Sequence, residues 1–230
     1  MSAGPPPICR YERKLVVEQR DPCQVRLWVR QNPALFREAY PPRWVNNFYF
    51  DSPELHQYSD NKDGTGNRRK IRVRWYGPLF GPVERPMLEF KIKAGLVGRK
   101  ESYPVPAFVV DQGKGLEPLA LALRAAQLPL MVRRELTFVR PTLLNRYHRE
   151  YYVSADGAFR LTLDSNLEFC RLRSHGDTFL ERCATQQFTV LELKFHDGTA
   201  SEAESITNAF PLRLTRMSKY VRSVEGLYGW

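Results

Sequence analysis

The most regular pattern in the chain is an alternation of charged and apolar residues at a period of two. Three segments show it clearly: 70–75 (KIRVRW), 88–93 (LEFKIK) and 191–195 (LELKF). Successive side chains of a β-strand point to opposite faces, so each segment predicts a strand with one ionic face and one apolar face. Several such ionic faces, brought together around a closed sheet, would form a charged, water-filled interior that suits a polyanion.

Apolar periodicity and turn residues predict nine strands, beginning near residues 10, 44, 67, 85, 97, 142, 158, 167 and 187. Helices are predicted over 23–30, 116–128, 201–209 and 218–228, with short ones after Ser52 and over 130–136. Nine strands are enough to close an antiparallel barrel of about eight. The fold class expected is therefore α+β, a closed barrel with a polar, basic tunnel and flanking helices that cover the apolar strand faces.

Length and composition favour a single globular domain. The chain has 230 residues, 43% hydrophobic and 26% charged, and no Gly/Ser-rich or charged linker divides it. We expect a flexible segment over 1–9, which contains three prolines, and one domain over 10–230. The first residues do not read as a secretion signal, and no apolar run approaches the roughly 20 residues of a membrane helix. A cytoplasmic, soluble protein without a membrane span is expected.

Charge narrows the class of partner. A formal charge of +10, from 35 Lys and Arg against 25 Asp and Glu, favours anionic partners. Nucleic acid is not expected, because the cations alternate with acids instead of forming one exposed stripe. The four cysteines form no C-x-x-C pair and are expected to be reduced, and the four histidines lack zinc-ligand spacing.

The ionic strand faces combine many cations with a few acids. Cations can hold phosphate oxygens, and a few carboxylates can hold Mg²⁺ or Mn²⁺, which prefer oxygen ligands. The alternative is that these are solvated outer faces with cross-strand ion pairs. By strand parity the ionic faces collect eight Lys/Arg and four Asp/Glu: Glu12, Lys14, Lys70, Arg72, Arg74, Glu89, Lys91, Lys93, Arg160, Asp164, Glu192 and Lys194.

Short motifs in a fixed order point to a known family. They are 11–14 (YERK), 47–52 (NFYFDS), 67–77 (NRRKIRVRWYG), 88–91 (LEFK), 147–149 (YHR), 160–164 (RLTLD), 191–194 (LELK) and 218–220 (SKY). Together they resemble the catalytic domain of the vacuolar transporter chaperone (VTC) family, over about 10 to 224. Each motif alone is weak, but their joint order is specific.

The resemblance implies a triphosphate tunnel fold and a polyphosphate polymerase. Such an enzyme moves the γ-phosphate of ATP onto an inorganic polyphosphate chain and releases ADP, with Mn²⁺ or Mg²⁺ as cofactor. The resemblance suggests phosphate-holding catalytic roles for Lys14, Arg72, Arg74, Lys91, Arg149, Arg160 and Lys219. It places Arg216 near the tunnel wall as a substrate-binding residue. Lys70, Lys93 and Lys194 are added as substrate-binding residues, with Glu192 as the principal metal ligand and Glu12, Glu89 and Asp164 as secondary acids.

Several alternatives remain open at this point. The wider tunnel superfamily often carries E-x-E-x-K on its first strand, whereas this chain has Arg10, Glu12 and Lys14. A triphosphatase acting on triphosphate or nucleoside triphosphate, or a non-catalytic polyphosphate-binding module, would use the same cations. Arg149 could instead pack against neighbouring tyrosines or exchange places with Arg146 through a bulge, and Lys219 could be a plain surface lysine. Protein partners are not indicated.

Overall fold

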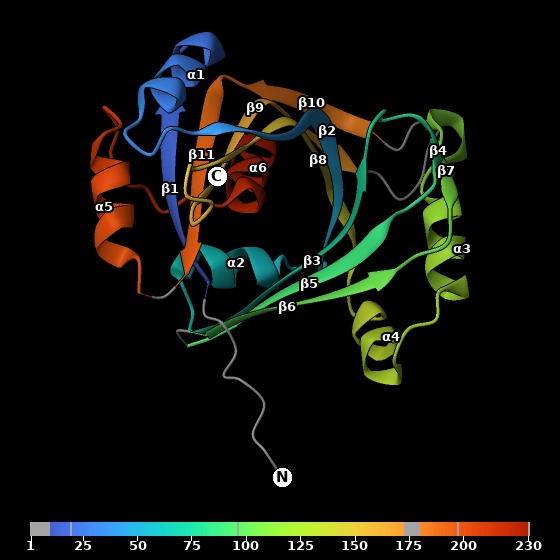
Figure 1. Cartoon of the computed structure of the whole chain (residues 1–230). Coiled ribbons are helices and arrows are strands. Elements are labelled where there is room, and N and C mark those ends of the chain that lie inside the picture. The colour runs from blue at the N-terminus through green and yellow to red at the C-terminus, as the bar shows by residue number, and fades with distance from the viewer. Residues whose placement is uncertain (1–9, 19, 96, 173–179, 197, 230) are drawn as a thin grey trace. The chain divides into compact units, whose positions relative to one another are not determined.

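The computed structural model describes residues 10–18, 20–95, 97–172, 180–196 and 198–229 (Figure 1). The expected flexible segment 1–9 lies outside these residues. The chain forms two compact units: unit 1 comprises the described residues of 1–43, 148–167 and 187–217, and unit 2 those of 44–147, 168–186 and 218–230. Three long strands contribute residues to both units. That the whole forms one domain stays a prediction.

Most strands belong to one nine-stranded sheet, and every ladder with a described register is antiparallel. The hydrogen-bonded order runs from β1 to β6, so an α+β fold is confirmed whereas closure into a barrel is not shown. The order is β1 (Arg10–Glu18), β11 (Phe188–His196), β9 (Arg160–Leu172), β8 (Arg140–Val153), β2 (Arg37–Asp51), β3 (Asn67–Tyr76), β5 (Met87–Ala94) and β6 (Val97–Pro104), with β10 (Leu180–Gln186) beside β9.

Unit 1 buries the apolar faces of β1, β9 and β11. Leu15, Leu161 and Leu191 are at most 1% exposed, as strand parity predicted. Two helices cover these apolar strand faces, α1 (Pro22–Gln31) and α5 (Ala200–Asn208). Asp21 caps α1, because its carboxylate accepts a hydrogen bond of 2.8 Å from the amide of Cys23. A fully buried Leu side chain contributes roughly 1.5–3 kcal/mol, so the apolar faces anchor the ionic ones.

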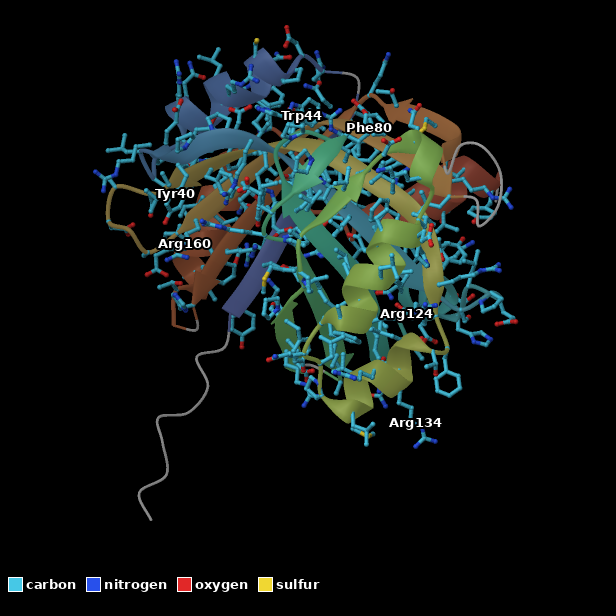
Figure 2. All side chains as sticks on the ribbon, turned by 90° about the vertical axis from the view of Figure 1, so that its right-hand side faces the viewer. Tyr40, Trp44, Phe80, Arg124, Arg134 and Arg160 are labelled. Atoms are coloured by element: carbon cyan, nitrogen blue, oxygen red, sulfur yellow. A yellow bond between two sulfur atoms is a disulfide. The ribbon has the colours of Figure 1, made fainter. Side chains whose placement is uncertain are left out.

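Unit 2 buries the apolar faces of β3 and β5 in the same way. Ile71, Val73 and Leu88 are fully buried beneath α3 (Glu117–Ala125) and α4 (Leu130–Leu136). Arg124 on α3 and Arg134 on α4 are exposed on the outer side of these helices (Figure 2). The unit also contains a small sheet and three further helical segments. These are β4 (Gly81–Val83) with β7 (Phe108–Val110), α2 (His56–Asp63), the 3-10 helix η1 (Gln112–Lys114) and α6 (Lys219–Tyr228).

The structure differs from the sequence-based strand assignments in several places. The strands expected at 158 and 167 form one continuous strand, β9, in which Asn166 adopts a positive φ of 51° that asparagine tolerates. Strand β2 begins at Arg37, seven residues before the expected start, despite two prolines. The short strands β4 and β7 and the strand β10 were not predicted.

The cysteine expectation is wrong for two residues. Cys170 on β9 and Cys183 on β10 form a disulfide, although no sequence motif marks the pair. The two strands are hydrogen-bonded neighbours, which brings the sulfurs together. Cys23 is a free, exposed cysteine. Separately, none of the helices described is long and apolar enough to cross a membrane.

Candidate functional site: two clusters of phosphate-binding character

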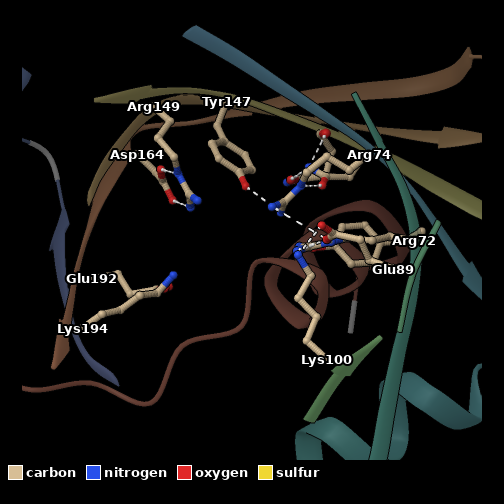
Figure 3. A network of polar contacts seen from close by, with 12 residues as sticks. Arg72, Arg74, Glu89, Lys100, Tyr147, Arg149, Asp164, Glu192 and Lys194 are labelled. Carbon is tan, nitrogen blue, oxygen red and sulfur yellow. Dashed lines mark hydrogen bonds and ion pairs between the residues drawn. The ribbon is translucent and has the colours of Figure 1, made fainter. Parts of the chain in front are cut away.

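The first cluster, which we call the Glu89 cluster, lies in unit 2 on β3, β5 and β6. The register places Arg72 directly opposite Glu89. Glu89 contacts three cations: Arg72 at 2.6 Å, Lys100 at 2.6 Å and Arg74 at 3.8 Å (Figure 3). The Glu89 side chain is only 6% exposed, and those of Arg72 and Arg74 are 20% and 10% exposed. The two arginine pairs are cross-strand pairs of the alternative interpretation, but they are largely buried instead of solvated, whereas the Lys100 side chain is exposed.

Electrostatic interactions within the Glu89 cluster keep Glu89 and Arg72 ionised at neutral pH. Burial by itself would raise the pKa of Glu89, but the charges of Arg72, Arg74 and Lys100 outweigh it and lower that pKa to about 2. Burial would likewise lower the pKa of Arg72, whereas Tyr49, Glu89 and Tyr147 raise it above its ordinary value. At neutral pH the cluster therefore holds one carboxylate among three cations.

Neutral side chains fix the directions of the two guanidinium groups. Arg72 donates to the Tyr49 hydroxyl at 3.2 Å, and Arg74 donates to the Asn47 side-chain oxygen at 2.9 Å. Arg74 also donates to the hydroxyl of Tyr147 at 3.3 Å. Because these bonds span β2, β3 and β8, the sheet itself orients the arginines.

Lys219 joins the same cluster from the start of α6. Its ammonium lies 4.9 Å from the centre of the Tyr147 ring, and the hydroxyl of Ser218 caps the helix by accepting from the amide of Val221. The neighbouring Tyr220 is buried, donates to the carboxylate of Asp51 and stacks on Tyr49. Lys219 is thus held by a packed helix terminus, which disfavours the alternative of a plain surface lysine.

Cations continue along the same strand faces away from Glu89. Lys91 on β5 pairs in register with Lys70 on β3 and with Lys100 on β6. Lys93 pairs with Arg68 further along the ladder. Like charges opposite one another destabilise a sheet, so rows of cations across three strands favour the binding of an anion.

The second cluster, which we call the Glu192 cluster, lies in unit 1. Lys14 on β1 pairs in register with Glu192 on β11, and Glu12 pairs with Lys194. The Lys14 ammonium lies 3.3 Å from the Glu12 carboxylate and 3.7 Å from that of Glu192. Lys194 also contacts the Glu192 carboxylate, through its other oxygen, at 2.9 Å. Glu192, with a side chain only 10% exposed, is therefore bracketed by two lysines.

Unit 1 also contains an ion pair between the adjacent strands β8 and β9. Arg149 on β8 donates two hydrogen bonds, of 2.6 and 2.7 Å, to the carboxylate of Asp164 on β9 (Figure 3). Asp164 is fully buried, so its charge is committed to this pair. In unit 2, Arg146 instead lies 3.8 Å from the ring centre of Trp44 and 3.6 Å from Glu168. An ion pair thus holds Arg149 in place.

Two predicted cations of unit 1, Arg160 and Arg216, are exposed, and their side chains form no hydrogen bond or ion pair with the residues that the structure describes. Arg160 pairs in register with Lys194, so it shares the face of the Glu192 cluster. Arg216 follows the bridge between Leu214 and Leu15 on β1. Both positions leave a guanidinium group accessible to a phosphate.

The predicted metal ligands fit a divalent ion unequally. Within the described part of the chain, no three His, Cys, Asp or Glu side chains gather closely enough to hold a metal. Glu12 and Glu192 converge on Lys14, and two carboxylates supplemented by phosphate oxygens are a usual Mg²⁺ environment. Asp164 and Glu89 pair with arginine at 2.6 Å and are more deeply buried than Glu192, so they fit a metal less well. Glu192 would exchange its lysine contacts, at 3.7 and 2.9 Å, for the ion.

Sequence reasoning missed several members of the Glu89 cluster, namely Lys100, Tyr147, Tyr49 and Asn47. Lys100 had a usable signal, because in a meander it lies on the β6 face that adjoins Glu89 and Lys91. Asn47 and both tyrosines lie within the motifs 47–52 and 147–149, but their contacts with the arginines depend on which strands become neighbours.

Comparisons with known proteins agree with this fold. The VTC domain family model matches residues 9–228, and no curated protein matches. The PH1819 protein of Pyrococcus horikoshii is 14% identical, with a TM-score of 0.51 over 94% of this chain and 99% of its own. A candidate adenylate cyclase of Vibrio parahaemolyticus is 13% identical, with a TM-score of 0.48 over 91% of this chain and 95% of its own. Because the family model covers nearly the whole length, the chain belongs to the VTC domain family.

Proposed function

We propose that this protein is a triphosphate tunnel enzyme that acts as a polyphosphate polymerase. The single observation that carries the proposal is the row of cations, Lys70, Lys91 and Lys100, next to the buried arginines of the Glu89 cluster. Such a row suits a ligand with several linked negative charges, which ATP and inorganic polyphosphate both supply. Membership of the VTC domain family supports the choice of reaction. The closed tunnel expected from the sequence is part of this proposal.

The reaction needs positioning and charge neutralisation more than a covalent residue. An oxygen at the end of the polyphosphate chain attacks the γ-phosphorus of ATP. The bond from that phosphorus to the β,γ-bridging oxygen breaks, and ADP leaves with the electron pair. Arg72 and Arg74, whose directions are fixed by Tyr49 and Asn47, would hold equatorial oxygens of the transferred phosphoryl group, and Lys219 would add a further charge.

Glu89 has a preparatory role in this scheme. It neutralises Arg72 and Arg74 while no substrate is bound, so the buried guanidinium groups stay folded in place. A phosphate oxygen can then bind the remaining N–H groups without reorganising the strands. Charge-assisted hydrogen bonds of this type contribute roughly 1.5–3 kcal/mol each.

Glu192 and Glu12 would hold a divalent ion, Mn²⁺ or Mg²⁺, which when bound offsets negative charge on the phosphates. Lys14 and Lys194 bracket Glu192 and keep its carboxylate oriented. Arg149, Arg160 and Arg216 would contribute further positive charge to the phosphate chain. A cytoplasmic location and the absence of nucleic-acid partners remain predictions.

Sizing the phosphate products after incubation of the purified protein with ATP and Mn²⁺ separates the candidate functions. Long polymers, with one ADP released per phosphate added, support the polymerase. Orthophosphate alone would show the triphosphatase, in which water replaces the acceptor chain. Tight polyphosphate binding without any turnover would leave a binding module and contradict the proposal.

A further inference from the structure

Unit 1 contains a pocket whose lining combines three cations assigned from the sequence, Arg149, Arg160 and Lys194, with residues of β2 that received no role there. Its volume is about 600 Å³, and all its lining residues belong to unit 1. Strand β2 contributes Arg37 and Tyr40, and β9 contributes Arg160 and Thr162. Tyr40 and Arg160, labelled in Figure 2, both line this pocket. The pocket lies on the face that carries the Glu192 cluster, because Lys194 is also part of its lining.

The charges of the pocket are only partly neutralised. Two of its cations are already paired, Arg149 with Asp164 and Lys194 with Glu192. The side chains of Arg37 and Arg160, in contrast, make no hydrogen bond or ion pair with the residues described. Glu38 is the one acid among the described lining residues. Two unpaired guanidinium groups against one carboxylate leave a net positive charge in a cavity of ligand size.

A buried hydroxyl points to the same conclusion independently. Thr162 is only 8% exposed, and its hydroxyl oxygen has no hydrogen-bond partner in the part of the chain that is described. An unsatisfied buried polar group costs roughly 1–3 kcal/mol. Because Thr162 reaches the pocket, a molecule bound there can supply the missing partner.

The pocket also has an aromatic part. Tyr40 is 64% exposed, although its ring already packs edge-on against Tyr151 at 5.9 Å. An exposed ring beside unpaired arginines suits a ligand that carries phosphate and, in a nucleotide, a flat base as well. A pocket of this size has room for several phosphoryl groups or for a nucleotide.

We propose that this pocket is a phosphate subsite in which Arg37, Arg160 and Thr162 bind a phosphoanhydride, either of ATP or of the inorganic chain. The proposal deepens the polymerase function and rests on it for the class of ligand. Arg37 is thereby a substrate-binding residue that the sequence pattern did not reveal, because it lies on the proline-containing start of β2.

Calorimetric titration with inorganic tripolyphosphate at fixed ionic strength tests the subsite. Arg37→Gln should weaken binding about tenfold, the loss of one charge-assisted hydrogen bond. Thr162→Val should weaken it severalfold without lowering the thermal midpoint. Arg30→Gln removes an equal charge from an exposed position on α1 and should leave binding within about twofold of the native value. Arg37→Gln and Thr162→Val variants that both bind like Arg30→Gln would overturn the proposal.

The same titration in an Arg72→Ala, Arg74→Ala background separates this proposal from the polymerase assignment. Tripolyphosphate binding that survives in this background should weaken by a further factor of about ten when Arg37→Gln is added. If that happens and the native protein makes no polymer, the subsite stands and the polymerase function fails. If Arg37→Gln leaves both polymer synthesis and tripolyphosphate binding unchanged, the polymerase function stands and the subsite fails.

A third titration identifies the source of the phosphoanhydride. Tyr40→Ala should weaken ATP alone if the nucleotide base lies against this ring. An equal small effect on ATP and tripolyphosphate would assign the pocket to the inorganic chain. Both results support a phosphate subsite. The subsite is contradicted if the substitutions in the pocket change the affinity for neither ATP nor tripolyphosphate.

Discussion

Replacing Glu89 by glutamine removes the one carboxylate from a group of three cations. The ordinary pKa of 4.5 falls to about 2 in the folded protein, a difference of roughly 2.5 units. At 1.36 kcal/mol per unit this corresponds to about 3 kcal/mol of stability at neutral pH. Breaking a buried ion pair by removing one partner costs about 3–5 kcal/mol, which agrees in magnitude. Glu89→Gln should therefore lower the free energy of unfolding by about 3 kcal/mol.

The pH dependence of this loss has a definite sign. The folded-state pKa of Glu89 is depressed, so its stabilisation is complete above about pH 4.5 and is lost as the pH falls toward 2. Urea unfolding of the native protein and of Glu89→Gln should differ by about 3 kcal/mol at pH 6 and by about 2 kcal/mol at pH 3.5. Glutamine does not titrate, so the difference arises from the native residue.

A matched control lies on the neighbouring strand. Glu101 pairs with Arg99 at 2.7 Å, but the Arg99 side chain is 69% exposed. Exposed pairs contribute about 0–1 kcal/mol, so Glu101→Gln should lower the free energy of unfolding by less than about 1 kcal/mol. Equal losses for Glu89→Gln and Glu101→Gln, or a pH-independent difference, would refute the assignment of Glu89 as the buried counter-ion of Arg72 and Arg74.

Three further predictions concern individual contacts. Asp51 accepts hydrogen bonds from three backbone amides and from Tyr220, so Asp51→Asn should cost about 1–3 kcal/mol in urea unfolding; no loss would contradict this capping role. Replacing Cys170 and Cys183 together by serine should cost roughly 3 kcal/mol, and a reducing agent should lower the thermal midpoint of the native protein alone. Glu192→Gln should raise the Mn²⁺ concentration for half-maximal turnover at least about tenfold, and an unchanged Mn²⁺ profile would remove Glu192 from the metal site.

The period-two alternation of charged and apolar residues was sufficient to predict the strands that carry the candidate site and the face that each strand buries. Lys70, Arg72 and Arg74 alternate with Ile71 and Val73, and the structure buries the apolar set under helices as parity requires. These assignments succeeded because a one-residue shift would expose the whole apolar face.

Non-local features could not be obtained in this way. The disulfide depends on β10 lying beside β9, and the Arg149–Asp164 pair on β8 lying beside β9. Strand neighbours are set by the complete topology, which period-two patterns do not contain. Arg37 escaped notice for a local reason, because its strand begins among prolines that usually exclude regular pairing.

The most direct test of the central claim is the turnover of ATP to polymer by a variant with Arg72→Ala and Arg74→Ala. The control variant Arg124→Ala with Arg134→Ala loses the same charge from exposed helix positions. Circular dichroism and thermal midpoints should first establish that both variants are folded. The account predicts that polymer synthesis is abolished in the first variant and normal in the second. A folded first variant with unchanged turnover would contradict the assignment of the arginines of the Glu89 cluster as phosphate-binding residues.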